Sequence, residues 1–484
     1  MKKGDLLELD IISYAFEGKG VAKIIKEYVT QNESEAKKYV VFVNGSYPGD
    51  KVIAQITKIR TSYAEARIKE LVIKSPLRIL PECKYFGTCG GCKAQDLDYQ
   101  QQIKFKEEQV KDIFERIGGF QNFDILPIIS SEKTFFYRNK MEFSFADKRW
   151  LTQNEISSGL EIPDSSFALG LHIPGMFDKV LDIDVCYLQS EISNGILNFT
   201  RDFSKKHQLL PYSPQKHTGF LRNLVIKQSF LTNDLMVNLV ISEESERLFT
   251  LYKEELLNQF PEVTTLVYNI NKKLSQVAYG DYEIVAHGPG YIYEFIGKYK
   301  FRISANSFFQ TNSAQAEKLY STALEFAGFD NQEDVVYDLY SGAGTIPIFI
   351  SQYVKQLFGF ESVEPAIEDA KINIELNSIR NFIPILANLN NSFLPIIENQ
   401  SIPKPTVIIA DPPRGGMHPK TVNDILELKP SKIVYISCNP ATQARDIKLL
   451  CTGGYNLIKI RPVDMFPHTY HIENVALLKI GKQE

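Results

Sequence analysis

The first 74 residues alternate apolar and polar positions in four short stretches, at 6–12, 20–25, 38–44 and 50–59. Alternation with a period of two is typical of β-strands that bury one face. The run NGSYPGD at 44–50 is rich in turn residues. The pattern predicts a small antiparallel barrel over residues 1–74. Barrels of this oligonucleotide-binding kind carry nucleic acid on one face, although the same pattern suits a barrel that only packs on its neighbour.

Helical spacing of apolar residues follows in the segment 98–120, which ends at a pair of glycines and predicts a helix that stops at Gly118. Strand-like runs then recur at 140–145, 224–228, 234–241 and 264–270. A polar stretch at 151–166 is expected to be an inserted loop. The region 75–290 is therefore predicted to be a mixed, β-rich central domain.

Compact apolar runs dominate the last third of the chain, at 335–340, 356–361, 405–411 and 432–437. Such runs are typical of strands buried on both faces of a parallel sheet. Helical patterns separate them, which predicts a doubly wound α/β domain of the Rossmann-like type over residues 291–484.

The composition adds limits to this division. A chain of 484 residues is too long for one hydrophobic core. It has no apolar run of about 18 residues and no N-terminal signal pattern, so we expect a cytoplasmic protein without a membrane segment. The net charge of −4 does not exclude an RNA partner, because phosphate contacts need only a local basic surface.

A nucleotide pocket is indicated where the strand at 335–340 runs into a glycine turn. Gly342 and Gly344 allow the backbone to approach a ligand closely. Glu361 ends the next strand, 23 residues after Asp338, where an acidic side chain can accept both ribose hydroxyls of an adenosine. The third glycine of dinucleotide-binding loops is replaced, which favours S-adenosylmethionine over NAD.

Two further strand ends carry candidate chemistry. Asp411 begins an Asp-Pro-Pro sequence, and the next residue is Arg414 rather than the aromatic residue typical of amino-group methyltransferases. Cys438 directly follows the strand at 432–437, where a thiolate could add to C6 of a pyrimidine and make its C5 nucleophilic. A merely buried cysteine is the alternative. A base must then remove the C5 proton, and His468, His471 and Glu473 are candidates.

Three of the six cysteines, Cys83, Cys89 and Cys92, lie within ten residues. The cytosol keeps thiols reduced, so a metal site is favoured over disulfides. Cys186 is the remote thiol that could supply a fourth ligand. Four thiolates suit either zinc or an iron–sulfur cluster, and the spacing does not distinguish them.

Together these segments resemble the RNA uracil-5-methyltransferase family, especially its 23S ribosomal RNA members with an N-terminal TRAM domain. The resemblance covers nearly the whole chain. It rests on CKYFGTCGGCKAQDLDYQQQIKFK at 83–106, FYRNKMEFSF at 136–145, NSFFQTN at 306–312, DLYSGAGT at 338–345, DPPRGG at 411–416, SCNPAT at 437–442 and PHTYHIE at 467–473. Family members often have phenylalanine and cysteine where this chain has Tyr340 and Ser341.

The resemblance implies roles for individual residues. Cys438 would be the nucleophile and Glu473 the general base. The residues implied to contact S-adenosylmethionine are Gln310, Tyr340, Glu361 and Asp411, and those implied to hold a 4Fe-4S cluster are Cys83, Cys89, Cys92 and Cys186. The family comparison thereby resolves the choice between zinc and an iron–sulfur cluster.

The expected function is methylation of C5 of one uridine in 23S ribosomal RNA by a monomeric enzyme. The same chemistry on a transfer RNA T-loop uridine, or on two ribosomal uridines, is the first alternative. An amino-group methyltransferase, which would not need Cys438, and a non-catalytic RNA-binding protein, which would tolerate loss of Glu473, are alternatives of other classes.

Overall fold

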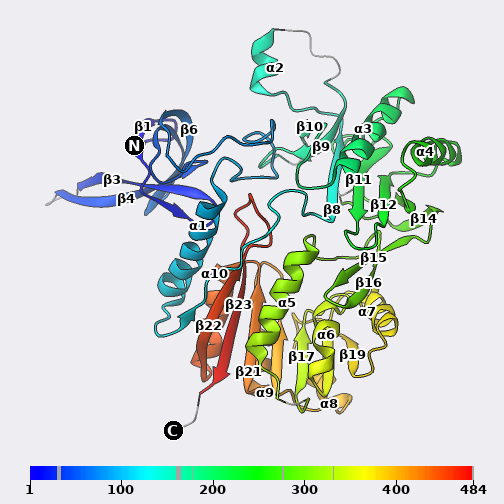
Figure 1. Ribbon diagram of the computed structural model, residues 1–484. Coiled ribbons are helices and arrows are strands. Elements are labelled where there is room, and N and C mark those ends of the chain that lie inside the picture. The colour runs from blue at the N-terminus through cyan, green and yellow to red at the C-terminus, as the bar shows by residue number, and fades with distance from the viewer. Residues whose placement is uncertain (30–33, 160–164, 177, 275–276, 331, 482–484) are drawn as a thin grey trace.

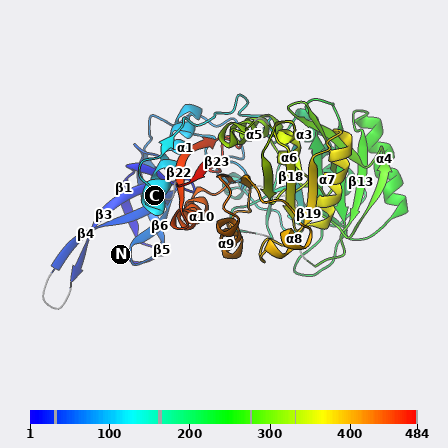
Figure 2. The same cartoon turned by 90° about the horizontal axis from the view of Figure 1, so that it is seen from below.

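The computed structural model describes residues 1–29, 34–159, 165–176, 178–274, 277–330 and 332–481. The chain forms three sheet-based units, and Figures 1 and 2 show the N-terminal barrel and the central domain on opposite sides of the molecule. No helix among the described residues has the length and apolar character needed to cross a bilayer.

The N-terminal unit is a six-stranded sheet that closes on itself. Its strands are β1 (Leu6–Asp10), β2 (Ser13–Ala15), β3 (Lys19–Val29), β4 (Ser34–Asn44), β5 (Lys51–Ile59) and β6 (Tyr63–Ile73), in the order β1-β5-β6-β4-β3-β2. The consecutive strands β1 and β2 pair with β5 and β3 at the two ends of this order, which closes the barrel. Leu9, Val41 and Val52 fill its core. The structure therefore confirms a barrel, but β4 pairs with β6 in parallel, so the barrel is not wholly antiparallel as predicted.

The central unit is a seven-stranded sheet with the order β10-β9-β8-β11-β12-β13-β14. Its strands are β8 (Lys140–Ala146), β9 (Ala168–His172), β10 (Val180–Asp182), β11 (Leu221–Gln228), β12 (Leu235–Ile241), β13 (Thr265–Ile270) and β14 (Tyr282–His287). The helices α3 (Glu191–Lys206) and α4 (Glu246–Gln259) cover one face. A hairpin of β15 (Tyr291–Ile296) and β16 (Tyr299–Ser304) follows. Met236 and Val267 of the central sheet share one hydrophobic core with this hairpin and the C-terminal domain.

The C-terminal unit is an eight-stranded sheet with the order β19-β18-β17-β20-β21-β23-β22-β7. Its strands are β17 (Val335–Leu339), β18 (Gln356–Glu361), β19 (Phe382–Leu386), β20 (Val407–Ala410), β21 (Lys432–Ser437), β22 (Tyr455–Val463), β23 (Glu473–Ile480) and β7 (Asp124–Ile125). The strands β17 to β21 are parallel, and β23 is antiparallel to both β21 and β22. The predicted α/β domain is thus observed.

Helices cover both faces of this sheet. One face carries α5 (Ser313–Ala327), α6 (Thr345–Ile350) and α7 (Glu364–Leu376), and the other carries α8 (Leu394–Asn399), α9 (Pro419–Leu428) and α10 (Pro440–Thr452). The two cores are separated by the sheet, which is the arrangement of doubly wound folds.

The segment between the barrel and the central sheet belongs spatially to the C-terminal domain. Helix α1 (Tyr99–Asp112) continues into a π-helical turn (Ile113–Gly118) whose apolar side chains enter the core beside α10. The strand β7 then pairs with β22 at the sheet edge. The predicted helix is present. It was assigned to the central domain at 75–290, but it packs against the C-terminal domain.

The polar stretch at 151–166 is not wholly a loop, which corrects the prediction for its first half. A short helix, α2 (Gln153–Ser158), begins after Thr152, whose side chain caps it together with Glu155. The sequence signal was this Thr-x-x-Glu capping box. Residues 160–164 lie outside the described residues.

Candidate active site

The predicted site residues follow neighbouring strands of the C-terminal sheet. Glu361 ends β18, Tyr340 follows β17, Asp411 follows β20 and Cys438 follows β21. Because the carboxyl ends of parallel strands meet at one edge, these residues lie at the edge of the sheet where ligands bind in open α/β folds. The sheet order places them in a row.

The glycine turn after β17 is shaped by contacts with β18. The Gly342 N–H donates to Glu361 Oε2 at 3.0 Å, and the N–H groups of Ser362 and Val363 donate to Glu361 Oε1. Gly342 and Gly344 both adopt positive φ, and a Cβ at Gly344 would meet the Phe382 ring at 2.8 Å. The carboxylate of Glu361 is therefore fixed beside the turn, and Gly344 lets the backbone pass close to the Phe382 ring.

The acidic side chains of Asp338, Glu361 and Asp411 lie close together at these strand ends. Asp338 is fully buried, and its two carboxylate oxygens have no hydrogen-bond partner among the described residues. Burial, with repulsion from Asp411 and Glu361, holds the pKa of Asp338 well above its usual range. Burial raises the pKa of Asp411 to about 7. Such a site favours a cationic ligand, because a nearby positive charge would stabilise the ionised carboxylates.

Cys438 lies next to the acidic group. Burial, followed by the carboxylates of Glu473 and Asp411, raises the pKa of the Cys438 thiol to about 11. The nearby positive charge of Arg414 opposes this shift and lowers the pKa of the thiol in part. Arg414 was not predicted as a site residue; the indication in the sequence was its place after the paired prolines.

Glu473 faces Cys438 across the pair β21 and β23. The register pairs Ser437 with Asn474, so the next pair outward brings Cys438 opposite Glu473, where facing residues are roughly 5 Å apart between Cα atoms. Burial and repulsion from Asp411 hold the pKa of Glu473 well above its usual range, while Arg414 opposes the shift.

The two histidine candidates for the base lie differently. His471 contacts the Nη2 atom of Arg414 at 3.1 Å through Nδ1, and burial and Arg414 lower its pKa to about 4. His468 is buried, and its Nδ1 contacts Gln102 on helix α1 at 3.2 Å. The geometry therefore favours Glu473 over either histidine.

The two other predicted cofactor contacts, Gln310 and Tyr340, lie on separate segments of the chain. Gln310 is half-buried in the loop between β16 and α5, where its backbone carbonyl accepts from Asn139 Nδ2 at 2.8 Å. Tyr340 adopts a positive φ of 69°. The left-handed backbone at Tyr340 is costly for a side chain, and it turns the chain from β17 toward the glycine turn.

The four predicted cysteine ligands line one cavity in the central domain, together with Gln95 and Tyr85. Burial raises the pKa of Cys92 to about 12 and that of Cys186 to about 11, and repulsion between neighbouring cysteines adds to both shifts. Among the described residues, no three His, Cys, Asp or Glu side chains are placed to hold a single metal ion. The four predicted ligands therefore line one cavity, but the structure does not show the predicted iron–sulfur site there.

Comparisons with known proteins agree with this architecture. The TRAM domain matches residues 2–69, and the tRNA (Uracil-5-)-methyltransferase family matches residues 295–480. An uncharacterized RNA methyltransferase of Chlorobaculum tepidum is 43% identical over 98% of this chain and 96% of its own length. A second, from Bacteroides thetaiotaomicron, is 44% identical over 96% of this chain and all of its own.

A solved structure is also similar over its whole length. The crystal structure of Pyrococcus abyssi tRNA (uracil-54, C5)-methyltransferase in complex with S-adenosyl-L-homocysteine has a TM-score of 0.72 and 28% sequence identity. The similarity covers 98% of this chain and 100% of that one. The barrel, central sheet and α/β domain therefore have counterparts in one solved chain.

Proposed function

Since this chain belongs to the S-adenosylmethionine-dependent RNA uracil-5-methyltransferase family and has its TRAM domain, we propose that Cys438 forms a covalent bond to the target uridine. The observation that carries the proposal is the placement of Cys438 opposite Glu473 and beside Arg414 and Asp411. An amino-group methyltransferase needs no thiol at this position.

The chemistry follows from these groups. The Cys438 thiolate adds to C6 of uridine, and the electron pair of the C5–C6 bond moves to form an enolate. C5 then attacks the methyl group of S-adenosylmethionine, which leaves as S-adenosylhomocysteine. Glu473 removes the proton from C5, the C5–C6 double bond re-forms, and the thiolate departs. A uridine in folded RNA must first rotate out of its stack to reach the sulfur.

S-adenosylmethionine is proposed to bind along the strand ends. Glu361 would accept the ribose hydroxyls, since its carboxylate is fixed beside the glycine turn. Asp411 would lie near the sulfonium, with Tyr340 and Gln310 as further contacts. Support comes from the buried, partnerless carboxylate of Asp338, which indicates a missing cationic neighbour.

The central cavity is proposed to hold a 4Fe-4S cluster through Cys83, Cys89, Cys92 and Cys186. A single zinc ion would draw the sulfurs onto one centre at about 2.3 Å, whereas a cluster spreads its four thiolates over a larger body. The proposal is supported by the single cavity that all four cysteines line, although among the described residues no group of three His, Cys, Asp or Glu side chains is placed to hold a metal ion. Protein purified without oxygen should be brown, and Cys89→Ser should abolish the colour, while Cys451→Ser outside the cavity should keep it.

The RNA substrate is proposed to be 23S ribosomal RNA, bound by the barrel at 1–74, the cluster-bearing domain at 75–290 and the catalytic domain at 291–484. A transfer RNA is the second candidate, because the similar solved structure is of a transfer RNA enzyme. Nucleoside mass spectrometry of both RNAs from a deletion strain tests the choice.

Re-expression in that strain tests the nucleophile as well. Wild type and Cys451→Ala should restore the lost 5-methyluridine, and Cys438→Ala should not. Restoration by Cys438→Ala would refute the covalent mechanism, and loss of 5-methyluridine from transfer RNA alone would refute the ribosomal target.

A further inference from the structure

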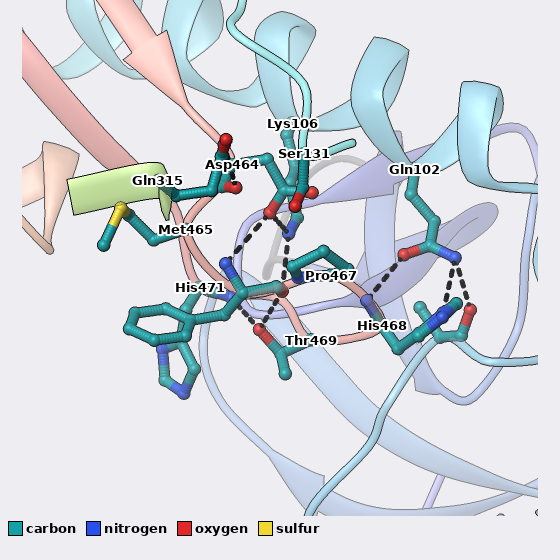
Figure 3. A network of polar contacts seen from close by, with 12 residues as sticks. Gln102, Lys106, Ser131, Gln315, Asp464, Met465, Pro467, His468, Thr469 and His471 are labelled. Carbon is teal, nitrogen blue, oxygen red and sulfur yellow. Dashed lines mark hydrogen bonds and ion pairs between the residues drawn. The ribbon is translucent and has the colours of Figure 1, made fainter. Parts of the chain in front are cut away.

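The loop between β22 and β23, residues 464–472, precedes Glu473 and is held by parts of the chain outside the catalytic sheet (Figure 3). Each of the five consecutive carbonyl groups from residue 464 to residue 468 accepts a hydrogen bond. The donors, in order, are Gln315 Nε2, Asn312 Nδ2, Lys106 Nζ, Tyr137 Oη and the backbone N–H groups of Lys93 and Ala94. An irregular buried loop depends on such donors, because it has no strand or helix partners of its own.

The strongest of these contacts is a buried ion pair. Lys106 Nζ of helix α1 lies 2.7 Å from Asp464 Oδ1, and the two side chains are 4% and 0% exposed. The other carboxylate oxygen of Asp464 accepts from Tyr99 Oη at 2.9 Å. A buried pair of this kind is strongly destabilised when one partner is removed, because the remaining charge is left uncompensated.

Gln102, one turn earlier on α1, holds the tip of the loop. Its Oε1 accepts from the His468 N–H at 2.9 Å, and its Nε2 donates to the carbonyls of Ala94 and Leu97. His468 has a φ of 64°, a conformation that persists only where surrounding contacts impose it. One glutamine therefore connects the tip of the loop with the chain that follows Cys92.

The same loop continues into the reacting groups. The His471 N–H donates to Thr469 Oγ1 at 3.1 Å, and Thr469 Oγ1 donates to the Phe466 carbonyl at 2.8 Å. His471 contacts Arg414, whose positive charge acts on the Cys438 thiol. Glu473 is the first residue after the loop. A shift of the loop would therefore displace Glu473, the proposed base.

We propose that Lys106 and Gln102 are positioning residues that hold the base-bearing loop, and that they link the cysteine-bearing segment to removal of the C5 proton. The inference rests on the proposed function. Its specific consequence is that loss of the Lys106 or Gln102 contacts slows removal of the C5 proton more than it slows addition of the thiol to C6. Proton removal needs Glu473 aligned with C5, whereas addition of the thiol depends on Cys438 at the end of a sheet strand.

Lys106→Met tests the proposal, with Lys104→Met as the matched control. Lys104 is on the same helix but is exposed, and its only described ion-pair partner is the exposed Glu108 at 4.0 Å. The substrate is RNA from the deletion strain, with radiolabelled S-adenosylmethionine. Denaturing gels then separate labelled protein–RNA adduct from released methylated RNA. Gln102→Leu is a second variant, and retained binding of S-adenosylhomocysteine shows that each variant is folded.

We expect the ratio of adduct to released product to rise roughly tenfold or more in Lys106→Met or Gln102→Leu, and to stay at the wild-type value in Lys104→Met. An unchanged ratio in the folded variants, or a parallel loss of adduct and product, would overturn the inference and leave only a structural role. Loss of S-adenosylhomocysteine binding in both variants would also overturn it, because the contacts of Lys106 and Gln102 would then be needed for folding of the whole catalytic domain. Absence of adduct in wild type would instead refute the proposed function.

Discussion

Binding of S-adenosylmethionine is predicted to release protons and to strengthen as pH rises. The pKa of Asp411 is raised by burial to about 7, so about one molecule in eleven carries the ionised carboxylate at pH 6 and about ten in eleven at pH 8. A sulfonium cation binds the ionised form in preference. The affinity should therefore rise about tenfold between pH 6 and pH 8, with about half a proton released by Asp411 at pH 7.

Isothermal titration calorimetry in two buffers with different heats of ionisation measures both quantities. S-adenosylhomocysteine is the matched ligand, because it lacks the positive charge at sulfur and should show the smaller pH dependence. Asp411→Asn should remove the Asp411 share of proton release, while the shares of Asp338 and Glu473 remain. Equal pH dependence for the two ligands, or proton uptake on binding, would refute the reasoning.

Three further predictions concern the thiol, the base and the packing of the π-helical turn. Because burial raises the pKa of Cys438 to about 11, stopped-flow rates of adduct formation should rise about tenfold per pH unit from 7 to 9; a flat profile would contradict a neutral resting thiol. Glu473→Gln should lower steady-state turnover by about 10²–10⁴ while labelled adduct accumulates on denaturing gels, and wild-type turnover would exclude Glu473 as the base. Phe114→Ala removes a ring with 0% exposure and should cost about 3–5 kcal/mol in urea unfolding. Ile117→Ala, with Ile117 57% exposed on the same turn, should change stability by less than about 0.5 kcal/mol; equal losses would contradict the assigned packing.

Local apolar patterns predicted four of the six barrel strands (β1, β3, β4 and β5) and four parallel strands of the α/β domain (β17, β18, β20 and β21), but not β2, β6 or β19. The period-two alternation before residue 60 and the buried runs ending near Asp411 and Cys438 mark strands directly. Strand-end positions then predicted one shared crevice, since the sheet is parallel there. The position of Glu473 could not be predicted from a local pattern, because its place opposite Cys438 depends on an antiparallel strand near the end of the chain.

Long-range packing was beyond the sequence pattern. Nothing local in helix α1 indicates that Lys106 pairs with Asp464, 358 positions away, and a lysine within a charged helix is ordinarily solvated. The sequence also gives no indication that β7 joins the catalytic sheet, since a strand of two residues has no detectable periodicity. The capping box at Thr152 was visible in the sequence, but it lay within a polar stretch that lacks an apolar face.

The covalent bond between Cys438 and RNA is tested most directly by trapping it. Incubation with 5-fluorouridine-substituted target RNA and S-adenosylmethionine should give a stable adduct, because fluorine at C5 cannot be removed as a proton is. Mass spectrometry after nuclease and protease digestion should find one methylated fluorouridine nucleotide on the peptide that contains Cys438. An adduct on another residue, or methylated RNA formed without any adduct, would contradict the account.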